Sequence, residues 1–584
     1  MINLNSTKAV KVSFCISLIF TSTAILVGSH MPATKYELSI YLSTPILFWI
    51  FIISSIFVCL VHLTSQSKYP LLVLTILYPA GAVFFLPIIR GYYYYGAGDS
   101  LTHLGITRDL LTGTISGIDF LYPGFHFIAS FIQSVTAIPL QITLMTLFPL
   151  LVIMYSLFTG IIVRQIVPKP QSLAIGVVSG LFLLPVNNIS THLMFHPSSM
   201  TIFFFPIVIF AGIKLRLFNK NIFDLKNGNV WRLLIFILLT SMTIFHPQQA
   251  GNAVVFILLV LFVSHFTSKI RDHTFPFSYF FSLIALILVV FVGWISTHSR
   301  PVLSGTVLVI RFIETVSDVF LGSSTSEISQ SSNLLSLFGG SIEILFIRVF
   351  SVNMIFIFLS VILILAVTHG WYGFSSYKLF TERMVVGTIP VVIMTIGLVG
   401  SDVGQSLRYF SFGMVAVTIF GGIVVSHLCT HLSIDLNMHK IGVVFTIIFL
   451  LVLPIMFHSP FVYLPTSHIT ESEHDSYKYL INMSPDEQEI LGVRATSKRH
   501  SSAILGYEYF SNLNKENTLP IAHADELQNT SDKNNYIIIG ASDIEREVIL
   551  YNSVEYTQSM FDSYSDSPSS NKIYSNGHSN SYIV

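Results

Sequence analysis

Long apolar stretches separated by short polar loops alternate along the first 460 residues of the chain. Thirteen of these stretches are close to the roughly 17–25 residues that an α-helix needs to cross a bilayer core. The pattern therefore predicts an all-α, multi-pass membrane protein. The predicted spans cover residues 12–30, 40–62, 70–89, 140–163, 171–187, 197–213, 232–246, 250–268, 276–297, 341–368, 384–400, 407–428 and 441–458.

A fourteenth apolar segment, residues 122–138, is placed by the distribution of charge. Short cytoplasmic loops of membrane proteins carry an excess of Lys and Arg. If this segment lies at the membrane surface and the N-terminus is inside, 15 of the 22 Lys and Arg residues before residue 461 fall in cytoplasmic loops. If it crosses, the basic loop 214–232 moves outside. We therefore expect 13 spans in a cell membrane, with a cytoplasmic N-terminus and an extracellular C-terminal segment.

The composition changes at residue 461. Residues 461–584 contain 17 Asp and Glu but only 8 Lys and Arg, a net charge of −9, whereas the preceding residues carry +9. Strand-like runs such as Tyr536–Gly540 and Glu547–Leu550 alternate there with polar segments. We expect an all-α transmembrane domain over residues 1–460, followed by an acidic, extracytoplasmic soluble domain of α/β or β fold.

The overall composition agrees with a membrane protein. Charged residues make up only 10% of the chain and the mean hydropathy is +0.71, whereas soluble proteins carry about 25% charged residues. The three cysteines all fall in apolar runs, which is typical of small buried side chains. The chain has no P-loop, GxGxxG or CxxC motif and no basic soluble patch, so nucleotide hydrolysis, redox chemistry and nucleic-acid binding have no support.

The most polar interruption of the apolar domain is the outside loop over residues 90–138, which begins around Gly96-Ala-Gly-Asp99-Ser-Leu-Thr-His103. On a helix beginning at Asp99, the side chains of Asp99 and His103 project from one face. A carboxylate at a membrane edge can accept the proton of an attacking hydroxyl group. It can equally cap the helix as its N-cap residue. The two roles are compatible.

Further ionisable side chains fall on the same predicted outer side of the membrane, where such groups mark functional sites by default. Arg408, at the start of a long apolar helix, can bind a phosphate bidentately or extend to the membrane interface. The residues predicted to bind substrate or phosphate are His103, Arg108, His126, His196, His246, Arg311 and Arg408.

Two histidines, His192 and His196, stand four residues apart, a spacing that formally suits a metal ion. No third ligand lies nearby in the sequence, so we assign no metal ligands. A divalent cation, Mg²⁺ or Mn²⁺, could still balance the charge of a phosphate in this kind of site.

At these residues the chain resembles the GT-C superfamily of integral-membrane glycosyltransferases, in particular the archaeal and bacterial relatives of dolichyl-phosphate-mannose–protein mannosyltransferases. The match is the segment Gly98-Asp99…His103, a short amphipathic helix that ends near Gly113, and Tyr122-Pro-Gly-Phe-His126 at the start of a second one. It covers residues 70–260 and implies a polyprenyl-phosphate sugar donor, an extracytoplasmic active site and inversion at the sugar carbon.

The same resemblance implies that Asp99 is the general base and that His103 and Arg408 lie near the donor phosphate. The chain departs from the family in two ways. Two spans are added before the acidic motif, and the second adjacent carboxylate of metal-dependent members is absent, with only Asp109 and Asp119 as substitutes.

The sequence thus predicts a hexosyltransferase that moves a sugar from a polyprenyl (dolichyl) phosphate to a glycan, lipid or protein acceptor outside the membrane. A transporter or flippase of lipid-linked saccharides is the alternative from another class, and it requires polar residues at mid-membrane depth. A glycan polymerase or ligase is a third possibility, which would rely on outside arginines and histidines instead of Asp99.

Overall fold

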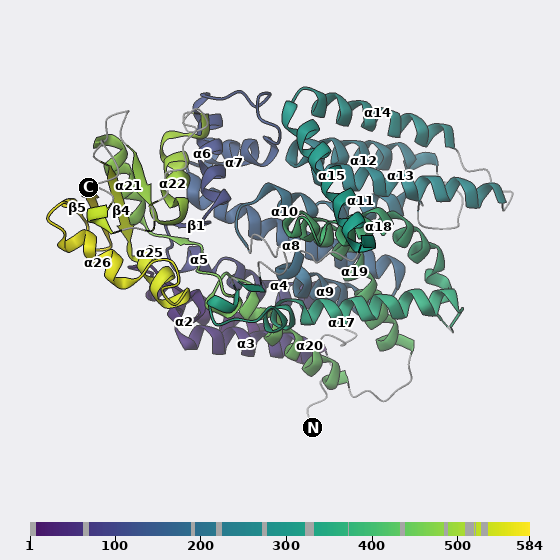
Figure 1. The fold of residues 1–584 in the computed structure, drawn as a ribbon. Coiled ribbons are helices and arrows are strands. Elements are labelled where there is room, and N and C mark those ends of the chain that lie inside the picture. Colours follow the sequence, from purple (N-terminus) through teal and green to yellow (C-terminus); the bar gives the residue numbers. More distant parts are fainter. Residues whose placement is uncertain are drawn as a thin grey trace.

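The computed structural model describes residues 7–61, 69–187, 193–215, 217, 225–270, 277–321, 332, 333, 335–371, 373–431, 438–483, 489–508, 519, 521, 523–526 and 535–584. Figure 1 shows a bundle of long helices, the helical body, formed by residues before 461, with the C-terminal domain (residues 461–584) packed against one end.

Every predicted span coincides with a helix, because these segments combine apolar side chains with few residues that break helices. Eight helices in the described ranges are long and apolar enough to cross a membrane, and five shorter apolar helices lie at the remaining predicted spans. The helical membrane body is thus confirmed, while the number of crossings stays a prediction. Its main helices are α1 (Thr7–His30), α3 (Ile46–Val61), α4 (Tyr69–Phe84), α8 (Leu140–Ile166), α9 (Gln171–Asn187), α10 (Pro197–Ile202), α11 (Phe205–Lys214), α12 (Leu225–Phe245), α13 (Pro247–Ile270), α14 (Phe277–Ser296), α15 (Ser299–Leu321), α17 (Ile342–Thr368), α18 (Lys378–Leu398), α19 (Val403–His431) and α20 (Met438–Val452).

Two short helices form the loop that joins α4 to α8. They are α6 (Asp99–Thr112) and α7 (Gly124–Thr136). With 13 residues, α7 is about 20 Å long, too short for the hydrocarbon core. It buries Phe125 and Ala129 but leaves Phe131 and Val135 69% exposed. An amphipathic helix of this kind suits the membrane surface, as predicted for residues 122–138.

The C-terminal domain is α/β, one of the two predicted fold types. Strands β3 (Ile490–Gly492) and β4 (Tyr536–Gly540) pair in parallel, and β6 (Ser579–Ile583) pairs antiparallel with both β4 and β5 (Asn571–Ser575), giving the sheet order β3-β4-β6-β5. The helices beside this sheet are α21 (Glu471–Met483), α22 (Thr496–Leu505), α25 (Ala541–Ile544) and α26 (Gln558–Asp566).

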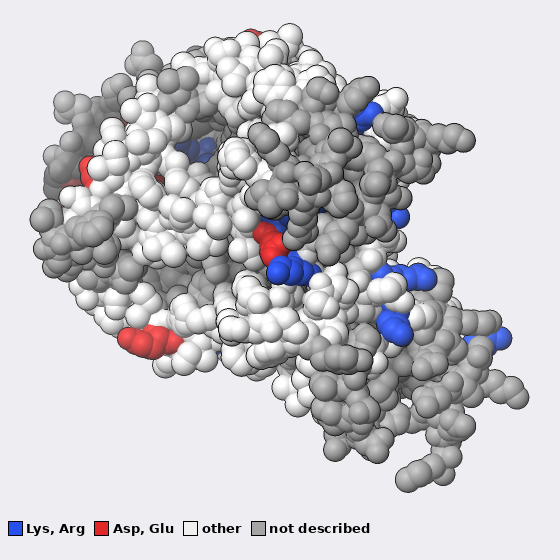
Figure 2. All heavy atoms as spheres, turned by 90° about the vertical axis from the view of Figure 1, so that its right-hand side faces the viewer, with Lys and Arg blue, Asp and Glu red and all other residues white. Residues whose placement is uncertain are grey.

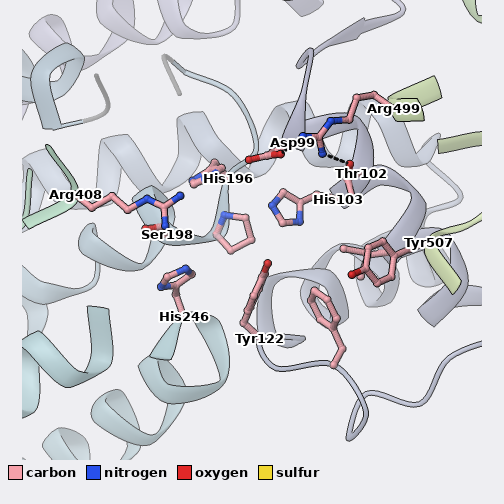
Figure 3. Close-up of a pocket in the computed structure, with 13 residues that line it drawn as sticks. Asp99, Thr102, His103, Tyr122, His196, Ser198, His246, Arg408, Arg499 and Tyr507 are labelled. Carbon is pink, nitrogen blue, oxygen red and sulfur yellow. Dashed lines mark hydrogen bonds and ion pairs between the residues drawn. The ribbon is translucent and has the colours of Figure 1, made fainter. Parts of the chain in front are cut away.

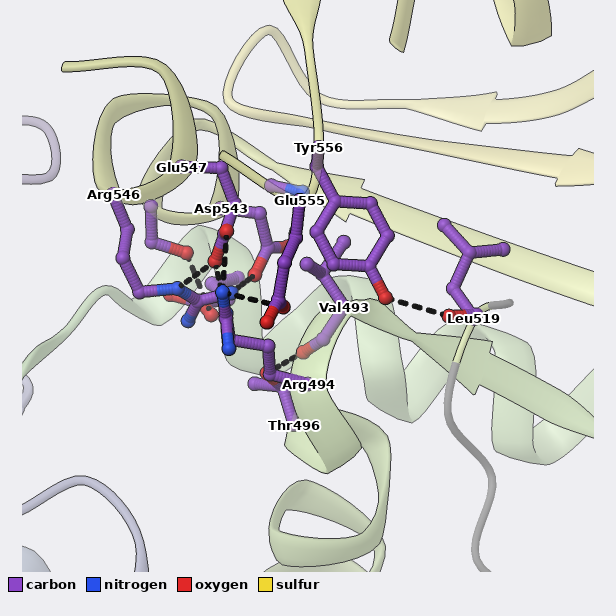
Figure 4. Close-up of polar contacts among 12 residues, drawn as sticks. Val493, Arg494, Thr496, Leu519, Asp543, Arg546, Glu547, Glu555 and Tyr556 are labelled. Carbon is purple, nitrogen blue, oxygen red and sulfur yellow. Dashed lines mark hydrogen bonds and ion pairs between the residues drawn. The ribbon is translucent and has the colours of Figure 1, made fainter. Parts of the chain in front are cut away.

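The predicted strand over residues 547–550 is wrong, because these residues form a π-helical segment, Glu545–Leu550. The helical conformation places Arg546 within 2.9 Å of Asp543 and 2.8 Å of Glu547. Arg494 also pairs with Glu547, at 2.6 Å, and with Glu555 (Figure 4). The Glu547 carboxylate is fully buried, so it needs both arginines to offset its desolvation. This ionic cluster fixes the start of α22.

The C-terminal domain is bound directly to the loop over residues 90–138. Strand β1 (Tyr94–Tyr95), just before α6, pairs with β2 (His468–Ile469) at the start of the domain. Helices α6 and α22 approach so closely that a Cβ atom on Gly105 would lie 2.1 Å from the Ser502 carbonyl oxygen. Only glycine permits this approach, which brings α22 to the same place as Asp99.

The opposite end of the helical body looks different. Among its described charged side chains, this face carries mainly Lys and Arg (Figure 2). It is the end at which the predicted cytoplasmic loops lie, including those with Lys214 and Lys378.

Candidate active site

A polar cavity of about 250 Å³ opens where the helical body meets the C-terminal domain. We call this cavity the Asp99 pocket (Figure 3). Its walls come from α6, the loop before α7, the start of α10, the α12–α13 junction, α19 and α22. The lining residues are Asp99, Thr102, His103, Ile106, Phe120, Tyr122, His196, Pro197, Ser198, His246, Arg408, Arg499 and Tyr507.

Asp99 is the first residue of α6, and Gly98 is the N-cap residue. The alternative prediction that Asp99 caps the helix as its N-cap is therefore wrong. Its side chain remains 55% exposed, and Oδ1 forms an ion pair with Nη2 of Arg499 at 2.8 Å. Nη1 of Arg499 donates to Oγ1 of Thr102, also at 2.8 Å. The carboxylate is thus held at the rim of the pocket.

The charges around Asp99 favour its ionised form. Burial raises the pKa of Asp99. The nearby charges lower it by more, with Arg499 having the largest effect, and then His103, His196 and Arg408. The pKa of Asp99 therefore lies below its usual value. A carboxylate that is ionised at neutral pH can accept a proton. The pocket therefore holds Asp99 in the form that a general base requires.

Three histidines lie between the ends of the pocket. Burial lowers the pKa of His103 to about 4, although Asp99 partly opposes this shift. Burial also lowers the pKa of His196 to about 3, and that of His246 well below its usual value. All three are neutral at pH 7, so each ring offers one donor and one acceptor. Their Nδ1 atoms are buried without a hydrogen-bond partner among the described residues.

Arg408 lies in the second turn of α19, and its guanidinium extends into the pocket from the side opposite Arg499 (Figure 3). In the described part of the chain it has no ion pair, whereas Arg499 is paired with Asp99. Ser198, at the start of α10, lies beside it. An arginine without a carboxylate partner in a polar cavity is suited to bind an anion such as phosphate.

The structure brings five of the predicted site residues together: Asp99, His103, His196, His246 and Arg408. The other three lie elsewhere. His126 is buried next to the pocket, where its Nδ1 lies 2.8 Å from Oγ1 of Thr107 and its ring lies 5.2 Å from that of His103.

Arg108 lines a second cavity, of about 450 Å³, together with Lys478 and His474. Its guanidinium donates to the carbonyl oxygens of Ala503 and Ile504 at the end of α22. Arg311 forms an ion pair with Asp402, the residue before α19. Both arginines therefore bind other parts of the protein in this structure.

The described residues contain no group of three or more His, Cys, Asp or Glu side chains that could hold a metal ion. His192, the predicted partner of His196, lies outside the described residues. Among the described residues, the pocket offers one carboxylate, Asp99, and the three histidines His103, His196 and His246.

Sequence reasoning missed Thr102, Ser198, Arg499 and Tyr507 as parts of the site. Arg499 and Tyr507 lie about 400 positions after Asp99 in the chain, and only the tertiary fold brings them to the pocket. One local signal existed, because Lys498, Arg499 and His500 form a basic run in an otherwise acidic domain.

No family model and no curated protein matches the chain. Among solved structures, two of ArnT from Cupriavidus metallidurans are similar to it. One is bound to undecaprenyl phosphate and has a TM-score of 0.48 at 9% sequence identity; the other, in the apo state, has a TM-score of 0.49 at 8% identity. Both matches cover 86% of this chain and 96% of the ArnT chain. At this level of similarity, neither structure tells what this chain binds or does.

Proposed function

We propose that the protein is a membrane glycosyltransferase that moves a sugar from a polyprenyl (dolichyl) phosphate to a hydroxyl group of a glycan, lipid or protein outside the membrane. One observation carries the proposal: an accessible carboxylate, Asp99, and an arginine that has no acidic partner among the described residues, Arg408, face one polar pocket at the end of membrane helices. The first suits proton abstraction and the second suits a lipid-linked phosphate.

In the proposed reaction, the acceptor oxygen forms a bond to the anomeric carbon while the bond from that carbon to the phosphate oxygen breaks. The acceptor proton passes to Asp99, and the electron pair of the broken bond stays on the lipid phosphate. Arg408 balances the developing negative charge, and the neutral histidines offer hydrogen bonds to it. A single displacement of this kind inverts the sugar carbon, as the family resemblance implies.

The positive charge at the pocket comes from Arg408 and Arg499. The proposed steps use these two charges and no metal ion. A requirement for Mg²⁺ or Mn²⁺ stays a prediction, which chelation with EDTA tests.

The position of the pocket favours a transferase over a transporter. His196 directly precedes α10, His246 lies between α12 and α13, and Arg408 is in the second turn of α19. These residues lie at the ends of predicted spans, whereas a transporter binds its substrate near the bilayer midplane.

The purified chain in liposomes, supplied with dolichyl phosphate carrying radiolabelled mannose or glucose, tests the proposal. Glycans released from the surface of cells that lack the gene serve as acceptors. We expect labelled acceptor and free dolichyl phosphate to appear in equal amounts. A flippase would move the labelled lipid across the bilayer with its sugar still attached, and that result would contradict the proposal.

A further inference from the structure

Two of the side chains that line the Asp99 pocket belong to the C-terminal domain. Arg499 lies in the first turn of α22, and Tyr507 follows that helix by two residues. Both are on the side of the pocket where Asp99 lies, opposite Arg408 (Figure 3). The helical body therefore supplies one end of the site, and the C-terminal domain supplies much of the other.

We propose that the C-terminal domain forms the acceptor half of the active site, in which Arg499 is the positioning residue for Asp99 and Tyr507 contacts a saccharide acceptor. This inference rests on the proposed function. The C-terminal domain recognises the acceptor, whose hydroxyl group must reach Asp99, and Arg408 binds the lipid phosphate.

Arg499 connects two residues on one face of α6. It pairs with Oδ1 of Asp99 and donates to Oγ1 of Thr102, each at 2.8 Å. The ion pair engages Oδ1 of the carboxylate. An acceptor hydroxyl can then donate to Oδ2. The Asp99 and Arg499 side chains are 55% and 40% exposed, so a water-borne acceptor can reach them.

The position of Tyr507 is fixed by α6. Oδ2 of Asp109 accepts hydrogen bonds from the backbone N–H groups of Tyr507, at 2.6 Å, and Glu508, at 3.0 Å. Gly506 adopts φ 102°, and a Cβ atom there would lie 2.1 Å from Oδ1 of Asp109. Glycine is therefore required at this turn, and the neighbouring Arg108 holds the end of α22. These contacts bring the ring of Tyr507 to the pocket.

Tyr507 belongs to an aromatic wall. Its ring packs edge-on to Phe120 at 6.1 Å between centroids, and Phe120 lies 4.6 Å from Tyr122. The C–H bonds on one face of a sugar ring carry partial positive charge and pack favourably on the electron-rich faces of aromatic rings. The three rings and Asp99 line the same cavity, so a saccharide on this wall would occupy the pocket that holds the carboxylate.

Replacement of Arg499 tests its positioning role, with Lys498→Gln as the matched control that makes the same change in charge on the same helix outside the pocket. We expect Arg499→Gln to lower kcat about 10- to 100-fold, because a small displacement of a catalytic group is costly. Without this arginine the pKa of Asp99 rises, so the acid limb of the pH–rate profile should move to higher pH.

Arg499→Lys should keep the acid limb near its wild-type position and recover part of kcat, and Lys498→Gln should match the wild type. A merely structural role would lower the unfolding temperature of Arg499→Gln without moving the acid limb. An unmoved limb in Arg499→Gln would overturn the positioning role.

Tyr507→Ala and Tyr507→Phe test the acceptor contact with the released surface glycans as the probe. We expect Tyr507→Ala to raise the KM for these glycans about three- to tenfold, the value of an aromatic contact, with the KM for the dolichyl-phosphate sugar unchanged. Tyr507→Phe keeps the ring and should raise this KM less than Tyr507→Ala does. An increase only in the donor KM, or no increase at all, would overturn the assignment.

The same assay separates this inference from the proposed function. If Asp99→Asn transfers sugar as well as the wild type, the proposed function fails. If Asp99→Asn is inactive while the Arg499 and Tyr507 variants keep wild-type kinetics and pH dependence, only the role of the C-terminal domain fails.

Discussion

Two arginines on the predicted outer side of the membrane, Arg311 and Arg408, differ in their partners. Arg311 is paired with Asp402 on a surface where both side chains are partly exposed. Arg408 faces the Asp99 pocket without an acidic partner among the described residues. Of these two arginines, we therefore expect only Arg408 to bind the donor phosphate.

We expect Arg408→Gln to weaken the binding of dolichyl phosphate about tenfold or more, because a hydrogen bond to a charged group contributes about 1.5–3 kcal/mol. Arg311→Gln serves as the control. An exposed ion pair such as that of Arg311 contributes only about 0–1 kcal/mol. The affinity of Arg311→Gln for dolichyl phosphate should therefore stay within a few-fold of the wild-type value. Equilibrium binding to the purified variants in detergent measures both, and equal losses would contradict the distinction.

The sequence predicted the site residues of the helical body better than those of the C-terminal domain. Five residues could be found because each interrupts apolar sequence on the same predicted side of the membrane: Asp99, His103, His196, His246 and Arg408. Arg499 lies in a polar domain, where a charged residue is ordinary. Its role depends on the packing of α22 against α6, which hydropathy does not encode.

Helix α6 is the element on which the site depends. Its pocket-facing side carries Asp99, Thr102 and His103, while Gly105, Arg108 and Asp109 hold the C-terminal domain. The close contact of α6 with α22 at Gly105 sets the distance between Asp99 and Arg499. A change at Gly105 should therefore affect catalysis without altering any side chain of the pocket.

In an open helix, Gly→Ala is stabilising by up to about 1 kcal/mol. We expect Gly105→Ala to lower the unfolding temperature and the transfer rate, because its Cβ would lie 2.1 Å from the backbone oxygen of Ser502. Gly305→Ala in α15, where no atom lies within 4 Å of the added Cβ, is the matched control and should be neutral or stabilising. Thermal unfolding and transfer assays measure both, and a neutral Gly105→Ala would contradict this account of α6.

At the scale of the whole molecule, the apolar pattern predicted where the helices lie because burial in lipid requires long apolar segments. The shape of the C-terminal domain was harder to predict. Residues 547–550 have a strand-like sequence, but the ion pairs of Asp543, Arg546 and Glu547 favour a helical segment there. Such tertiary contacts override local propensity.

The proposed orientation places the C-terminal domain outside the cell and the α17–α18 connection inside. Ile549 and Trp371 are 60% and 50% exposed in these two regions, so cysteines at these positions should react readily. We expect a membrane-impermeant maleimide to label Ile549→Cys in intact cells and Trp371→Cys only after lysis. Wild-type protein controls for the native cysteines, and the reverse pattern would place the pocket inside the cell.

The rate of sugar transfer by Asp99→Asn tests the central claim most directly. Asp119→Asn is the control, since Asp119 is an exposed acid in the same loop that does not line the pocket. We expect Asp99→Asn to lower kcat about 10²- to 10⁴-fold, the usual contribution of a general base, while its unfolding temperature and affinity for dolichyl phosphate stay near those of Asp119→Asn. Transfer by Asp99→Asn at the wild-type rate would contradict the account.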